Sequence, residues 1–77
     1  MNKLPSEVSQ YIQYVAPKLV GYPNVDAVLA GQDVLLNTMV MAAKDTSIEI
    51  GAENMYWQDK GAYTGETSPR ALADLGI

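Results

Sequence analysis

GAENMYWQDKGAYTGETSPRALADLG, residues 51–76, is the stretch that decides the fold of this chain. Its opening Gly-Ala pair follows a β-branched run, which predicts the end of a buried strand. Ser68 and Pro69 predict the start of a helix, because the Ser68 side chain can cap it and Pro69 fits its first turn. Gly76 suits the left-handed position that ends a helix. The stretch therefore predicts strand, long loop and helix.

The loop, residues 53–67, is unusually long for a connection between a strand and a helix. Such connections usually have roughly two to six residues, and one of about fifteen tends to carry function. We therefore expect the functional part of the chain to lie there.

The same stretch resembles the third strand and third loop of the triosephosphate isomerase family. The family pattern reads G-A-Q-N, a variable tip, G-A-[FY]-T-G-E-[IV]-S-P, then L-x-D-[LI]-G, and so many fixed positions at fixed spacing are a strong signal. The sequence departs from it at Glu53, where the family usually has Gln, and at Thr67, which replaces an aliphatic residue. The matching residues are Gly51, Ala52, Asn54, Gly61, Ala62, Tyr63, Thr64, Gly65, Glu66, Ser68, Pro69, Leu72, Asp74, Leu75 and Gly76.

Composition narrows the class of protein. The chain has 77 residues, so it holds one domain at most. It has no cysteine and no histidine, which excludes disulfides, thiolate nucleophiles, imidazole bases and Cys/His zinc sites. A net charge of −4 argues against nucleic acid and anionic membrane surfaces as partners. The sequence shows neither a membrane-spanning run nor a signal peptide, so we expect a soluble, cytoplasmic protein. No Asp-x-Asp-x-Asp-Gly pattern supports calcium binding either, so no metal site is expected.

The sequence before the loop predicts a helix, a strand, a second helix and a second strand. The first helix starts near Pro5 and ends or kinks near Ala16, before Pro17. Residues 25–30 and 47–52 read as short buried strands, with Asp33 as the cap of the helix between them. The expected buried faces comprise Val8, Tyr11, Ile12, Val15 and Leu19 on the first helix, and Leu35, Leu36, Met39, Val40 and Ala43 on the second.

This order predicts an α/β fold with the order α-β-α-β-loop-α and two parallel strands, and the resemblance implies that the chain is a partial (β/α)₈ TIM barrel. Two strands cannot close a sheet, so each is expected to present an unpaired edge and an incompletely covered face. Residues 1–77 are therefore interpreted as a single incomplete segment of a TIM barrel.

The resemblance implies that the parent protein is triosephosphate isomerase, an aldose–ketose isomerase of glycolysis and gluconeogenesis. It interconverts dihydroxyacetone phosphate and D-glyceraldehyde 3-phosphate without a cofactor. The family's catalytic Asn and Lys precede Met1, its His follows Ile77 and its Glu lies later, so no catalytic residue is expected in this chain. We therefore predict that the chain alone is inactive.

The resemblance also implies a homodimer in which this loop docks beside the active site of the neighbouring subunit. Thr64 would place its hydroxyl on the neighbour's catalytic Asn, Glu66 would pair with an Arg, and Asn2 would lie on the rim of the pocket that receives the loop. Glu53 would lie near the contact, where burying a carboxylate without a partner is costly. The expected interface residues are Asn2, Glu53, Asn54, Tyr63, Thr64, Gly65 and Glu66.

The same residues also have interpretations that involve no subunit contact. Thr64 and Glu66 would be solvated residues in any polar loop, and Glu53 an ordinary exposed carboxylate. Tyr56 and Trp57 are either an exposed hot spot or packing over the base of the loop. Met39 and Met41 are interpreted as helix packing, and Asp26 and Asp33 as solvated or capping residues. The alternative functions are a small non-catalytic interaction module docking through residues 61–66, and one piece of a split barrel.

Overall fold

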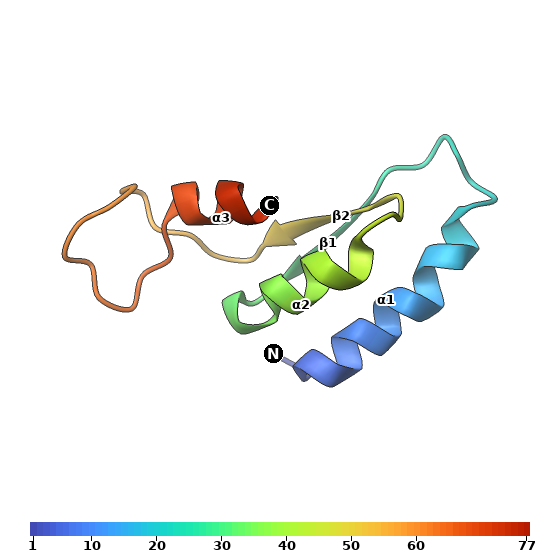
Figure 1. Cartoon of the computed structure of the whole chain (residues 1–77), viewed down its shortest axis with the longest axis horizontal. Helices are drawn as coiled ribbons and strands as arrows, with labels where there is room; N and C mark the ends of the chain where they lie inside the picture. The colour runs from blue at the N-terminus through green and yellow to red at the C-terminus, as the bar shows by residue number, and fades with distance from the viewer.

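The computed structural model describes all residues from 1 to 77. The elements follow the order α1 (Pro5–Leu19), β1 (Ala27–Gly31), α2 (Asp33–Ala43), β2 (Ile48–Ala52) and α3 (Pro69–Leu75) (Figure 1). The strands β1 and β2 pair in parallel, with Ala27 opposite Ile48 and Gly31 opposite Ala52. The predicted α/β fold with its order of elements is confirmed. No helix of the chain combines the length and the apolar character needed to cross a bilayer.

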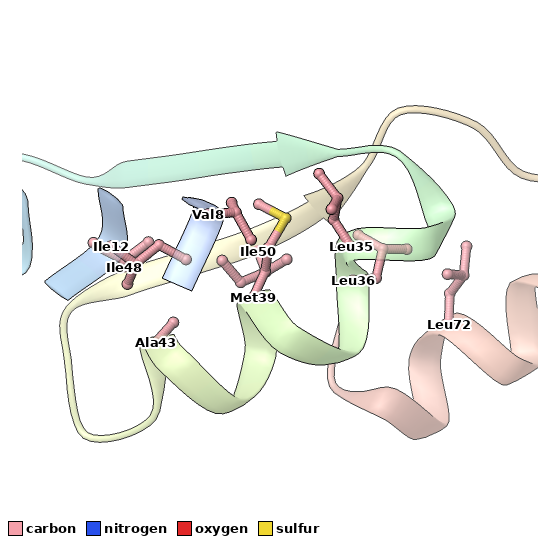
Figure 2. Packing of buried hydrophobic residues seen from close by; sticks show 9 residues of the cluster. All are labelled: Val8, Ile12, Leu35, Leu36, Met39, Ala43, Ile48, Ile50 and Leu72. Atoms are coloured by element: carbon pink, nitrogen blue, oxygen red, sulfur yellow. The ribbon is translucent and has the colours of Figure 1, made fainter. Parts of the chain in front are cut away.

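The core lies between the two long helices and one face of the sheet. Ile12 on α1 is fully buried, and Met39 on α2 is 3% exposed. Ile48 and Ile50 alternate with the exposed Glu49, so one face of β2 points into the core. Figure 2 shows these side chains meeting between β2, α1 and α2, with Leu72 of α3 at the end of the cluster. The buried residues are Val8, Ile12, Leu35, Leu36, Met39, Ala43, Ile48, Ile50 and Leu72.

The opposite face of the sheet is open. Val28 is 61% exposed although its neighbours along the strand point toward the core. Gly51 lies on the same face, because a Cβ on it would meet Val28 Cγ1 at 3.7 Å and Ala30 Cβ at 3.9 Å. The sheet has only two strands, so the outer edge of each lacks a ladder partner.

The sequence misplaced some boundaries of the elements. Strand β1 begins at Ala27 because the Val25 N–H donates to the Tyr22 carbonyl at 3.1 Å, which keeps Val25 in the preceding turn. Helix α1 does not end near Ala16 but runs on to Leu19. Pro17 sits in its last turn, where it removes a single backbone donor, and Leu19 still packs against the core.

Three side-chain predictions are wrong. Met41 is 64% exposed and Tyr11 is 40% exposed, so neither side chain belongs to the buried core. Asp33 is the first residue of α2, not its cap; Gln32 holds the cap position without a side-chain bond. The end of this helix is closed by Thr46, whose hydroxyl donates to the Ala43 carbonyl at 2.6 Å.

Candidate subunit-contact loop

The candidate site is the segment between β2 and α3, residues 53–68, called the projecting loop below. Figure 1 shows it, in orange, extending away from the strands and from α1 and α2. It accounts for the elongated shape of the chain, whose extents are 45, 26 and 17 Å. Its position after the carboxyl end of β2 is that of the functional loops in parallel α/β folds.

The base of the loop is held by hydrogen bonds at both ends. At its start the Glu53 N–H donates to the Gly31 carbonyl at 3.0 Å. At its end the Thr67 hydroxyl donates to the carboxylate of Asp33. Between the two arms of the loop, the Tyr56 N–H donates to the Thr67 carbonyl at 2.8 Å. The loop therefore leaves and rejoins the body at the turn between β1 and α2.

The exit into α3 forms as the sequence predicts. The Ser68 Oγ accepts from the Ala71 N–H at 3.4 Å, so Ser68 caps the helix, and Pro69 is its first residue. The same hydroxyl donates to the Asp59 carbonyl at 2.5 Å, which ties the loop to the start of the helix. Gly76 ends the helix in the left-handed region with φ 100°.

A tight turn presents Thr64. The Glu66 N–H donates to the Tyr63 carbonyl at 3.0 Å, which places Thr64 and Gly65 at the corners of the turn. Gly65 has φ 90°, a value that suits glycine at the second corner. Gly61 has φ 136°, and a Cβ there would lie 2.7 Å from Tyr63 Cε2. The backbone of the loop therefore favours glycine at both positions, Gly65 within the turn and Gly61 just before it.

Aromatic packing stiffens the loop from within. The ring of Tyr56 lies 4.7 Å from that of Tyr63 and 5.9 Å from that of Trp57, measured between centroids. Tyr56 is half-buried by this packing, whereas Trp57 is 76% exposed and Met55 is 59% exposed. Of the two interpretations of the aromatic pair, packing describes Tyr56 and an exposed apolar surface describes Trp57.

The residues expected at a subunit contact fall into two groups. Thr64, Gly65 and Glu66 are exposed together on the turn. Asn2 and Glu53 line a cavity of about 300 Å³ in the body, beside the carboxyl end of β1. The remaining members of the set, Asn54 and Tyr63, are exposed on the two arms of the loop.

One contact of the site was missed by the sequence analysis. The sequence pattern does not predict the hydrogen bond that joins Thr67 and Asp33. The signal for it in the sequence is the hydroxyl of Thr67, which can donate to a carboxylate. Nothing in the spacing of the two residues pointed from one to the other.

The side chains that could bind a metal ion are dispersed. No group of three or more His, Cys, Asp or Glu side chains converges in the structure. The loop presents the Thr64 hydroxyl, the Glu66 carboxylate and the exposed ring of Trp57.

A parallel strand–helix–strand unit followed by a long loop and a helix is the repeating unit of (β/α) barrel proteins. The chain belongs to the triosephosphate isomerase family, since residues 1–77 match the family model described as Triosephosphate isomerase.

Curated relatives carry the same name. The triosephosphate isomerase of Streptococcus suis is 40% identical over 77 residues, which are 100% of this chain and 31% of the relative. That of Lactiplantibacillus plantarum is 47% identical over the same shares of both chains. That of Streptococcus equi subsp. zooepidemicus is 45% identical over 76 residues, 99% of this chain and 30% of the relative. The chain thus spans less than a third of the length of these relatives.

Proposed function

We propose that residues 1–77 are one segment of a (β/α)₈ barrel that, when complete, is a triosephosphate isomerase. The complete protein would interconvert dihydroxyacetone phosphate and D-glyceraldehyde 3-phosphate in the cytoplasm, within glycolysis and gluconeogenesis, and would need no cofactor. The relatives' name supports this assignment, because it is shared by proteins that match the whole chain. The open sheet face around Val28 supports it as well, since the rest of a barrel would cover that face.

The chemical step would belong to parts of the barrel other than this segment. A triosephosphate isomerase uses a Glu as the base and a neutral His to polarise the carbonyl. This segment contains no His at all, and its exposed carboxylates do not converge on one another. The segment alone is therefore expected to be inactive.

The role proposed for this segment is the contact between subunits of a homodimer. The observation that carries the proposal is the projecting loop, which extends away from the strands (Figure 1) and has a turn on which Thr64 and Glu66 are exposed. Thr64 would bond the catalytic Asn of the partner subunit and Glu66 an Arg of that subunit. A rigid loop from one subunit would thus fix the geometry of the other's active site.

The cavity at the body supplies the second half of such a contact. In a two-fold symmetric dimer each subunit must carry both the inserting part and the receiving part. Asn2 and Glu53 line a cavity that lies apart from the turn at Thr64, so this chain offers a candidate for both parts. Asn54 and Tyr63, on the arms of the loop, would complete the buried surface.

A hybrid barrel tests the proposal. It is the triosephosphate isomerase of Lactiplantibacillus plantarum in which the matching segment is replaced by residues 1–77 of this chain. We expect the hybrid barrel to isomerise dihydroxyacetone phosphate and to sediment as a dimer. The isolated segment, assayed at the same concentration, should show no rate above background.

Two results would contradict the proposal. A folded, monomeric hybrid barrel would show that the projecting loop does not join subunits. Isomerase activity of the isolated segment would show that its own residues carry the chemistry. Binding of the isolated segment to an unrelated protein through residues 61–66 would instead favour the small interaction module.

A further inference from the structure

We infer that the hydrogen bond between Thr67 and Asp33 is a latch that orders the projecting loop for the partner subunit. The inference rests on the proposed function, because it concerns how the same loop reaches its partner. It makes Asp33 and Thr67 positioning residues that act through the loop and touch no substrate.

The latch is one of two bonds that fasten the loop to the same turn of the body. The Gly31 carbonyl, at the end of β1, accepts from the first residue of the loop, Glu53. Asp33, two positions further along the chain, accepts from Thr67 near the end of the loop. The turn between β1 and α2 therefore holds both arms of the loop.

These two hydrogen bonds differ in the side chains that they require. The bond from Glu53 to Gly31 joins backbone atoms, so any residue with an N–H can make it. The bond from Thr67 to Asp33 needs a hydroxyl on one side and an acceptor on the other. An aliphatic residue at position 67 could not donate it.

The remaining fastenings act within the loop or beyond it. The Tyr56 N–H bonds the Thr67 carbonyl, so fixing Thr67 also fixes the opposite arm. The following helix α3 contributes one buried side chain to the core, Leu72. Loss of the latch would therefore leave the loop attached to the body through Glu53 on one side and through α3 on the other.

An ordered loop binds more tightly than a loose one. A loop that is free before association loses conformational entropy when it docks, and this loss weakens the dimer. The latch removes part of that loss in advance, because it restricts both arms of the loop before the partner arrives. Its effect should appear in the dimer dissociation constant.

A double-mutant cycle in the hybrid barrel measures the latch. The variants are Thr67→Val, which keeps the shape and removes the hydroxyl, Asp33→Ala, which removes the acceptor, and the two together. Each single variant should raise the dissociation constant about five- to tenfold, and the double variant should raise it no further. Thr67→Ser and Asp33→Asn keep a donor and an acceptor and should stay near the parent value. Thr38→Val, the same substitution in the middle of α2, serves as the control.

Amide hydrogen exchange provides a second readout that does not depend on association. The Tyr56 N–H should lose protection in Thr67→Val and regain it in Thr67→Ser, also in diluted, monomeric protein. If the hybrid barrel that carries all 77 residues does not fold, a smaller hybrid that takes only residues 33–68 from this chain serves for the same double-mutant cycle.

The results separate the latch from the proposed function. Additive effects of the two substitutions, or unchanged constants in both single variants, would overturn the latch even if Thr64→Ala weakens the dimer. If Thr64→Ala and Glu66→Ala leave the dimer unchanged, the proposed subunit contact fails. Protection of Tyr56 that is unaffected by Thr67→Val would overturn the latch regardless of the oligomeric state.

Discussion

Gly61 shows how one residue can set the shape of the loop. Its φ of 136° and the ring of Tyr63 beside it leave no room for a side chain. Gly61→Ala should therefore lower the stability of the loop conformation by about 1–3 kcal/mol and weaken the dimer of the hybrid barrel. Gly21→Ala is the matched control, because a Cβ at Gly21 meets nothing within 4 Å. Equal dissociation constants for the two variants would show that the turn adapts to alanine.

Glu53 is a second residue whose substitution is informative. It is exposed in this chain and lines the cavity with Asn2, where the partner's loop is proposed to dock. Covering an unpartnered carboxylate would disfavour association, and Gln at that position would avoid this cost. We expect Glu53→Gln to raise the melting temperature of the hybrid dimer by about 2–4 °C at pH 7. An unchanged or lower melting temperature would favour the plainer interpretation, in which Glu53 stays solvated.

At the scale of elements, helix α2 carries one buried and one exposed methionine. Met39 is 3% exposed and Met41 is 64% exposed, although both lie on this helix. In the hybrid barrel, Met39→Ala should cost about 2–5 kcal/mol of unfolding free energy, because it leaves a cavity between α2 and the sheet. Met41→Ala should cost less than about 1 kcal/mol. Chemical denaturation of both variants checks the pair, and similar losses would mean that the two side chains are buried alike.

The boundaries of the helices and strands were predictable from the sequence only in part. Residues whose position follows from the backbone geometry of helix ends were predicted correctly: Ser68 caps α3, Pro69 begins it and Gly76 ends it. The start of β1 was missed because an apolar run does not say which of its residues bond to a neighbouring strand. The end of α1 was misplaced because the packing of Leu19 against the core outweighs the one backbone hydrogen bond that Pro17 removes.

The candidate site was predictable only in part, for a similar reason. The loop and its glycines follow from the pattern of residues 51–76. The contact of Thr67 with Asp33 joins residues far apart in the chain, so it depends on how the loop returns to the body. The local sequence does not determine the path by which the loop comes back to the body, so this contact is visible only in the folded chain.

At the scale of the whole molecule, the segment has little core for its size. Only 10 of its 77 residues are buried, and one sheet face and both outer edges are open. Burial of this extent hardly offsets the entropy of ordering a chain. We expect the isolated segment to be partly disordered or prone to aggregation, and to show no cooperative thermal transition by circular dichroism. A two-state transition at micromolar concentration would contradict this.

The central claim is that the projecting loop of this chain braces a partner subunit within a complete barrel. The most direct test is a crystal structure of the hybrid barrel. The account predicts a two-fold dimer in which the Thr64 hydroxyl lies within hydrogen-bond distance of the partner's catalytic Asn, while Thr67 still bonds Asp33. A loop that folds back over its own barrel, with Thr64 in solvent or against its own subunit, would contradict the account.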